Sequence, residues 1–213
     1  MKGYVITIFD NEKSEQAARR CIKSAAKHGL EAVMEPAITP EDSPMKIASD
    51  EEIPIEGFEE VYSRFDRCLS AFLSHYFLWK NCLEKNEPQV IFEHDAVVFD
   101  KIPENLKNPI VNLGKPSYGK FRTPQTLGET PLVSKKYFPG AHAYYITPAG
   151  ALDLINRAKT HAGPTDIFIN LDYFPYLHEY YPWPVDAKDS FTTIQNKNGC
   201  VAKHNYGETY EIL

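Results

Sequence analysis

The first 34 residues constrain the fold more than any other part of the sequence. Residues 4–9 are a near-continuous run of apolar and β-branched side chains, which predicts a strand buried on both faces. An amphipathic helical pattern follows, with Ser14 as the expected N-cap and Gly29 as the residue that ends the helix. Residues 30–34 then predict a second strand. This order predicts a βαβ unit, and therefore an α/β fold with a mostly parallel central sheet flanked by helices.

The rest of the chain continues the alternation of helices and strands. Residues 59–85 have a helical period with one broad apolar face. Short apolar runs predict further buried strands at residues 90–92, 110–113 and 141–147. Two more helices are expected to begin at Pro148 and near residues 164–166. Because the sequence has no internal repeat and no linker, we expect a single domain over residues 1–213.

Two proline-rich stretches interrupt this alternation. Residues 36–57 carry four prolines and many acids, and residues 114–139 carry four prolines and few aliphatic side chains. Loops of such length in a compact domain are usually lids or binding loops. We therefore expect both stretches to be irregular, and the second to be an excursion outside the core.

The charge balance weighs against a dedicated nucleic-acid binder. The net charge is −6 at pH 7 and the pI is about 5.7, whereas such binders are usually basic. Residues 115–136 differ from the whole, because Glu129 is the only acid among five basic side chains. These are Lys115, Lys120, Arg122, Lys135 and Lys136. The stretch is either a solvated loop or a surface for an anionic acceptor.

The cysteines and the length of the apolar runs indicate in which cellular compartment the protein is expected. The four cysteines form no C-x-x-C pair, and Cys68 and Cys82 fall on the apolar face of a predicted helix, which is typical of reduced thiols in a core. The N-terminus has no signal-peptide pattern, and no apolar run approaches the roughly 20 residues that cross a bilayer. We therefore expect a cytoplasmic protein without a membrane span.

The most informative local motif is Glu93-His94-Asp95, which follows a predicted buried strand. Carboxylates at the carboxyl edge of a parallel sheet, where ligands bind, can turn toward one cation. Such hard oxygen ligands suit Mg²⁺ or Mn²⁺ bridging a diphosphate. His94 either joins this site or faces the other way. The sequence has no dinucleotide-binding, Walker or nucleophile-elbow motif. No motif therefore supports a dinucleotide-dependent enzyme, an NTPase or a hydrolase.

Several segments, in chain order, resemble glycosyltransferase family 25, which includes lipooligosaccharide and collagen galactosyltransferases. The most specific is the block formed by a Ser-His helix at residues 73–80 and the acidic motif within residues 91–99. Residues 140–151 resemble the family's Gly-x-x-x-Tyr strand with its following helix of small residues. Residues 164–166 resemble its later Pro-x-Asp element, and residues 6–10 occupy the place of its first nucleotide-binding strand.

The resemblance implies a GT-A fold, a nucleotide-sugar donor that is most often UDP-linked, and inversion at the anomeric carbon. It also implies Mn²⁺ (or Mg²⁺) as the cofactor. One position departs from the family's Glu-Asp-Asp-Ala motif, because His94 replaces the central Asp. Glu93 and Asp95 still offer two carboxylates to a metal, but the departure bears on the affinity and choice of metal.

The same resemblance implies roles for individual residues. The donor contacts are expected from Phe9, Asp10, Ser74, His75, Glu93 and Asp95. The metal ligands are expected to be Glu93, Asp95 and His204. Ser74 and His75 either line the diphosphate end of the pocket or bond to backbone in the core. His204 either completes the metal shell or is a plain surface histidine.

A transferase of this kind also needs a carboxylate that takes the proton of the acceptor hydroxyl. Asp166 is the candidate for this catalytic base, and its alternative role is to cap the helix that follows Pro164. The other candidates are Asp172, Asp186 and Asp189.

The expected function is the transfer of a hexose, glucose or galactose, from a UDP-sugar to a glycan or another hydroxyl acceptor. Two alternatives stay open. One is a transferase that acts on a nucleic-acid base, which the basic stretch permits and the negative net charge disfavours. The other is a module that binds a nucleotide or glycan without turnover, and His94 in the acidic motif keeps it open.

Overall fold

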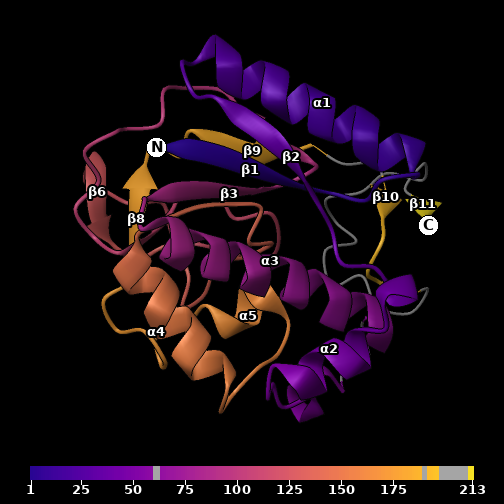
Figure 1. The fold of residues 1–213 in the computed structure, drawn as a ribbon. Coiled ribbons are helices and arrows are strands. Elements are labelled where there is room, and N and C mark those ends of the chain that lie inside the picture. Colours follow the sequence, from indigo (N-terminus) through magenta and orange to yellow (C-terminus); the bar gives the residue numbers. More distant parts are fainter. Residues whose placement is uncertain (60–62, 189–190, 197–210) are drawn as a thin grey trace.

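The centre of the protein is a seven-stranded sheet in the order β2-β1-β3-β7-β5-β8-β6 (Figure 1). This computed structural model describes residues 1–59, 63–188, 191–196 and 211–213. The strands of the sheet are β1 (Lys2–Thr7), β2 (Ala32–Pro36), β3 (Gln89–Glu93), β5 (Ile110–Asn112), β6 (Gly128–Pro131), β7 (Ala143–Ile146) and β8 (His178–Tyr181).

This sheet contains both parallel and antiparallel strand pairs. β1 lies between β2 and β3 and is parallel to both, and β5 is parallel to β8. β7 is antiparallel to β3 and to β5, and β6 is antiparallel to β8 at the edge. Five of the seven strands (β1, β2, β3, β5 and β8) therefore point the same way. The predicted α/β class is confirmed, and the sheet, expected to be mostly parallel, is mixed.

One face of the sheet is covered by α1 (Glu12–Lys27) and by a small ladder of β4 (Ala96–Val98) and β9 (Val185–Ala187). Alternate strand residues, such as Val5, Phe92 and Tyr145, point into this layer because side chains alternate along a strand. They pack against small residues of α1, including Ala18 and Cys21. The small side chains let the helix lie close to the sheet.

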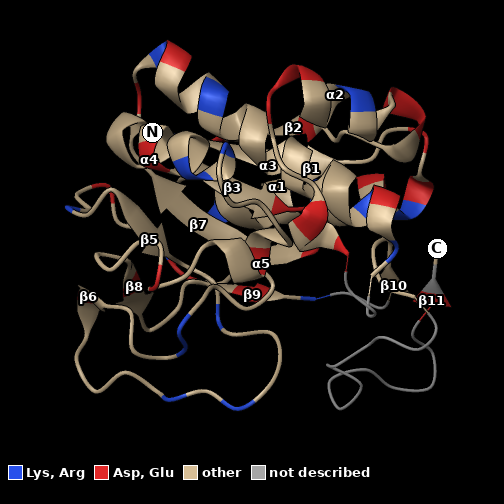
Figure 2. Ribbon diagram, turned by 90° about the horizontal axis from the view of Figure 1, so that it is seen from below, with Lys and Arg blue, Asp and Glu red and all other residues tan. Residues whose placement is uncertain are grey.

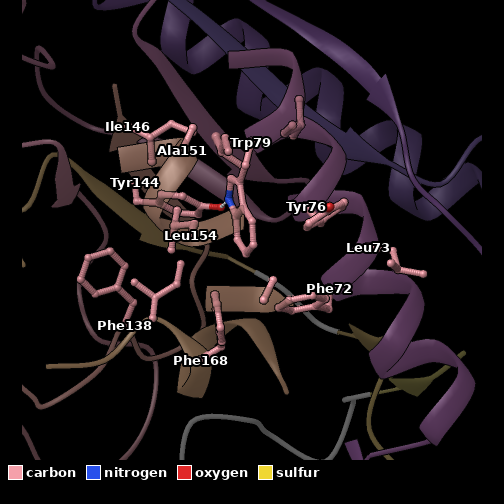
Figure 3. Packing of buried hydrophobic residues seen from close by; sticks show 14 of the residues in the cluster. Phe72, Leu73, Tyr76, Trp79, Phe138, Tyr144, Ile146, Ala151, Leu154 and Phe168 are labelled. Atoms are coloured by element: carbon pink, nitrogen blue, oxygen red, sulfur yellow. Dashed lines mark hydrogen bonds between the residues drawn. The ribbon is translucent and has the colours of Figure 1, made fainter. Parts of the chain in front are cut away.

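The opposite face is covered by four helices, of which α3 is the longest. They are α2 (Pro44–Asp50), α3 (Phe65–Lys85), α4 (Pro148–Ala158) and α5 (Thr165–Phe168). The core on this side is aromatic (Figure 3). Trp79 stacks on Phe168 with ring centroids 5.7 Å apart, and Phe72 meets both rings edge-on. The predicted helix over residues 59–85 therefore forms, although it begins six residues later than expected.

Some helix termini follow the sequence signals and others do not. α3 ends at Asn86, which adopts the left-handed conformation with φ 51°, and Thr147 caps α4 by accepting the backbone N–H of Gly150. The prediction that Ser14 caps the first helix is wrong, because Asn11 is the N-cap and its side chain accepts the backbone N–H of Ser14. Ser14 is instead buried and serves the site described below.

Both proline-rich stretches contain more structure than expected. Residues 36–57 hold α2 and two short helices, η1 (Pro40–Asp42) and η2 (Glu56–Phe58), with Pro44 at the start of α2. Residues 114–139 contribute the edge strand β6 and two core side chains, Leu132 and Phe138. Isolated apolar residues between prolines can still be buried, but they produce no periodic pattern that predicts where.

The cysteines and the helices were also compared with the expectations from the sequence. Cys21, Cys68 and Cys82 are buried and form no disulfide within the described residues, and Cys200 lies outside those residues. Within the described part of the chain, none of the helices has the length and apolarity needed to cross a membrane.

The last strands, β10 (Phe191–Thr192) and β11 (Glu211–Ile212), form a separate parallel pair near the carboxyl edge of β1.

A chain of hydrogen bonds runs through the aromatic core. The indole N–H of Trp79 donates to the hydroxyl of Tyr144 at 2.8 Å, and this hydroxyl lies 2.8 Å from Nδ1 of His75 (Figure 3 shows the first bond). All three side chains are at most 1 % exposed. Since the tyrosine hydroxyl accepts from the indole, its own proton is available to Nδ1 of the histidine.

Tyr144→Phe should therefore destabilise the fold more than its size suggests. The substitution leaves the indole N–H and the imidazole nitrogen without their partner in a dry core, at a cost of about 1–3 kcal/mol in the free energy of unfolding. Urea denaturation measures it. The matched control is Tyr145→Phe on the opposite face, because the Tyr145 hydroxyl makes no hydrogen bond within the described residues. Equal losses in the two variants would contradict the role given to the hydrogen-bond chain.

Candidate functional site

Two adjoining pockets lie where β1, β2 and β3 end. Because these strands are parallel, their carboxyl ends meet at one edge of the sheet, which is where α/β proteins bind ligands. The first pocket has a volume of about 460 Å³ and the second about 170 Å³. Both are lined by Ala71, Glu93 and Ile194, so they form one continuous cleft with Glu93 at the junction.

The first pocket gathers most of the residues expected to bind a donor. Phe9 and Asp10 enter from the segment after β1, and Ser74 and His75 from α3. Residues 37–41, which follow β2, form another part of the wall. Phe9 is 46 % exposed although it is aromatic, and Asp10 has a positive φ of 64°, so the chain turns sharply at the rim. These expected residues, distant in sequence, therefore share one wall.

Glu93 is held at the end of β3 by the core hydrogen-bond chain. Its Oε1 lies 3.3 Å from Nε2 of His75, whose Nδ1 faces the Tyr144 hydroxyl. Burial lowers the pKa of His75 to about 3, so the imidazole is neutral. With Nδ1 accepting from the tyrosine, Nε2 carries the proton and donates to Glu93. His75 thus orients the carboxylate without adding charge.

Ser74 bonds to the backbone around the first pocket. The Ser74 hydroxyl accepts the N–H of Ile38 at 2.9 Å, which fixes the segment after β2, and donates to the carbonyl of Ser70 at 2.9 Å. Of the two roles expected for Ser74, bonding to backbone is therefore the one observed, at a position that also lines the pocket.

His94 points toward α1 rather than toward the neighbouring carboxylates. Its Nδ1 lies 2.9 Å from the Ser14 hydroxyl, and the same hydroxyl accepts the backbone N–H of Ile8 at 2.9 Å. The ring packs against Phe191, and burial lowers its pKa to about 4. A neutral histidine therefore braces the turn after β3 against the start of α1.

Asp95 and Asp166 belong to the second pocket. Asp95 is 8 % exposed and lies in the turn after β3, where its carbonyl accepts the backbone N–H of Lys188 at 2.9 Å. Asp166 comes from the first turn of α5. Together with Glu93, the second pocket therefore brings together three of the predicted carboxylates.

The carboxylate of Asp166 divides its two oxygens between different partners. Oδ1 accepts the backbone N–H of Ile167 at 2.9 Å, and Oδ2 accepts the hydroxyl of Tyr118. Asp166 is not the N-cap of α5, since Pro164 holds that position. Burial raises the pKa of Asp166, while the hydrogen bonds from Tyr118 and from the backbone act in the opposite direction. Such a carboxyl can hold a proton closer to neutral pH than an ordinary aspartate.

The alternative bases are less well placed. Asp172 forms an exposed ion pair with Lys136 at 2.6 Å and is not among the described residues that line either pocket. Asp186 lies in β9 and is 3.6 Å from Nζ of Lys188. Asp189 lies outside the described residues, as does His204, the expected third metal ligand.

Glu93 and Asp95 could supply part, but not all, of the ligands of a divalent cation. Within the described residues, His, Cys, Asp and Glu side chains form no group of three or more that could hold a metal ion. Glu93 and Asp95 both line the cleft with hard oxygen donors. Mg²⁺ and Mn²⁺ commonly take one or two carboxylates and complete their shell with substrate phosphates and water. The donor set therefore suits a cation that binds together with a phosphorylated ligand.

Arg67 and Tyr118 are site residues that the sequence reasoning missed. Arg67 is the basic side chain of the first pocket and lies seven residues, or two helical turns, before Ser74 on α3. That spacing was a readable signal, because it places both residues on one helix face. Tyr118 gave no such signal, since it comes from an irregular segment whose path depends on tertiary contacts.

Comparison with known families agrees with this arrangement. The family model described as glycosyltransferase family 25 (LPS biosynthesis protein) matches residues 37–123, the part that holds α3, β3 and the acidic motif. A search of curated proteins finds no match. The resemblance read from the sequence is thereby confirmed, and over residues 37–123 this chain matches glycosyltransferase family 25.

Proposed function

We propose that the protein is a glycosyltransferase that moves a hexose, glucose or galactose, from a UDP-sugar to a hydroxyl of a glycan or another acceptor. The observation that carries this proposal is the two-part cleft, with carboxylates at its junction and on its far wall. A volume of about 460 Å³ in the first pocket is within the range of small-ligand sites. The family match supports glycosyltransferase activity, and a nucleotide pocket at the carboxyl edge of β1 supports a GT-A arrangement.

The first pocket is assigned to the donor. The strand ends and α3 supply Asp10, Ser74 and His75 around it, and Arg67 supplies a positive charge suited to a diphosphate. Glu93 and Asp95 would hold Mn²⁺ or Mg²⁺ on the side of the second pocket. Bound there, the cation would neutralise the negative charge that develops on the leaving nucleoside diphosphate. His75 keeps the Glu93 carboxylate in the orientation needed for this.

The second pocket is assigned to the acceptor. Asp166 takes the proton from the acceptor hydroxyl while the hydroxyl oxygen attacks the anomeric carbon. A base in the second pocket, separate from the donor pocket, is compatible with attack from the face opposite the leaving group, and therefore with inversion. The Tyr118 hydroxyl stabilises the ionised form of Asp166, and burial opposes it. These two influences set the pH at which the base is available.

The binding-module alternative loses its main support from the position of His94. That alternative depended on a histidine in place of the central acid of the motif. The His94 ring bonds Ser14 on α1, so the replacement leaves Glu93 and Asp95 at the cleft. A pure binder would retain nucleotide-sugar without releasing UDP, and an enzyme would release it slowly with water as acceptor.

UDP and Mn²⁺ should bind cooperatively. Two carboxylates alone make a weak site, and phosphate oxygens complete the shell, so Mn²⁺ should raise the affinity for UDP by about 5- to 150-fold. Calorimetry of UDP with Mn²⁺ and with excess EDTA measures this factor. Asp95→Ala should abolish the metal effect, while Asp100→Ala, in an exposed loop, should keep it. Equal UDP affinity with and without metal in the unmodified protein would refute the metal assignment.

Asp166→Asn should bind UDP and Mn²⁺ normally yet lose about 10²- to 10⁴-fold in rate, the usual contribution of a general base. The amide keeps the size of the side chain but cannot accept the proton. The measurement is UDP release from UDP-glucose or UDP-galactose, alongside calorimetry for binding. Asp172→Asn is the control, because its carboxylate pairs with Lys136 outside the cleft. Normal turnover by Asp166→Asn would leave Asp166 as a structural residue of α5.

Tyr118→Phe should move the acid limb of the rate profile to higher pH. The base works when ionised, so the rate is lost as pH falls through the pKa of Asp166. Removing the hydroxyl removes a donor that lowers this pKa and leaves the burial that raises it. The pH dependence of UDP release tests this, with Tyr137→Phe as the neighbouring control. An unchanged acid limb would show that another group titrates.

A further inference from the structure

A hollow with a basic lining lies next to the second pocket. Its walls come from two parts of the segment between β5 and β7, residues 120–122 and 132–136, together with Leu171. Four of these side chains are basic: Lys120, Arg122, Lys135 and Lys136. We call this feature the basic hollow. In Figure 2 the loops below β6 carry several blue segments, in keeping with this local excess of positive charge.

Most of this positive charge is not neutralised by neighbouring acids. Lys136 pairs with Asp172 at 2.6 Å, but within the described residues Lys120, Arg122 and Lys135 form no ion pair. The only acid of the stretch, Glu129, is occupied elsewhere, because it accepts the backbone N–H groups of Lys107 and Asn108 at 2.8 Å each. Three of the four cations of the basic hollow are therefore without an ion pair within the described residues, on a protein of net charge −6.

The floor of the basic hollow is fixed rather than loose. The carboxylate of Glu179 is fully buried beneath it and accepts the backbone N–H groups of Val133 and Ser134 at 2.7 Å each. Its second oxygen accepts the indole N–H of Trp183 at 3.0 Å. These three donors satisfy the hydrogen-bonding capacity of the Glu179 carboxylate. A preformed floor presents the cations at set positions, which suits recognition of a defined ligand.

Lys135 connects the basic hollow to the proposed catalytic base. Its Nζ lies 4.9 Å from the ring centre of Tyr118 and 5.0 Å from that of Tyr137, and it donates to the Tyr137 hydroxyl at 3.1 Å. The Tyr118 hydroxyl in turn donates to Asp166 in the second pocket. A ligand with one hydroxyl at Asp166 can therefore extend past Tyr118 into the basic hollow.

We propose that the basic hollow binds a negatively charged group, phosphate or carboxylate, on the acceptor glycan. The inference depends on the proposed function, since it extends the same acceptor from Asp166 outward. A neutral acceptor would gain nothing from several unpaired cations, whereas an anionic group forms charge-assisted hydrogen bonds with Lys120 and Arg122. The acceptor class is then an acidic glycan rather than a neutral one.

Binding to an array of matched oligosaccharides tests this inference. The array carries neutral glycans beside the same glycans bearing a phosphate or a uronate. The wild type should retain the charged forms over their neutral parents, and less so as salt rises, because exposed charges are screened. The two charged forms separate phosphate from carboxylate recognition.

A double variant with a matched control locates the binding. Lys120→Gln with Arg122→Gln should weaken binding to the charged glycans about tenfold or more. Both side chains are exposed, so the fold should be unaffected. Lys23→Gln with Lys27→Gln removes the same charge from the exposed side of α1 and should leave binding unchanged.

Three outcomes would overturn the inference: no preference for charged glycans, equal loss in both double variants, or capture by anionic lipid vesicles in place of glycans. UDP release from UDP-sugar, measured in the same variants, separates this inference from the proposed function. Normal UDP release without any charged-glycan preference refutes only the acceptor inference. A wild type that neither binds nor hydrolyses any UDP-sugar refutes the proposed function itself.

Discussion

The interaction on which the site depends is the hydrogen-bond chain from Trp79 through Tyr144 and His75 to Glu93. It begins in the driest part of the core and ends at a carboxylate of the cleft. Because burial keeps the imidazole neutral, these hydrogen bonds orient the Glu93 carboxylate without placing a positive charge beside it. The packing of α3 on β3 and β7 therefore determines where the acidic group points, and core stability and site geometry are coupled.

A second brace acts from the other face of the sheet. His94 and Ser14 tie the turn after β3 to the end of β1 and the start of α1. Successive residues of one motif thus make contacts on opposite sides, Glu93 with His75 of α3 and His94 with Ser14 of α1. The acidic motif tolerates a histidine at its centre for this reason. That position serves the scaffold, and the two flanking carboxylates serve the cleft.

Sequence reasoning identified the elements with strong periodicity and the residues next to them. The first βαβ unit, α3 and the acidic motif were readable because each has a continuous pattern or follows a buried strand directly. α2, β6 and Tyr118 were not readable, because they lie in proline-rich segments where burial depends on distant partners. The segment that carries Tyr118 meets α5 through tertiary contacts without a local signature, such as the backbone N–H of Phe138 bonding the carbonyls of Asp166 and Ile169.

The position of β3 in the sheet has a consequence for any attempt to isolate the motif. Its two neighbours are β1 and β7, and both lie outside residues 37–123, the segment that matches the family. A fragment limited to that segment would hold the acidic motif on a strand with both edges unpaired, prone to associate with other chains. During synthesis, likewise, β3 pairs with both of its neighbours only after β7 has been made. The acidic motif occupies a short segment, but the sheet that positions its carboxylates requires a chain that reaches at least to Ile146.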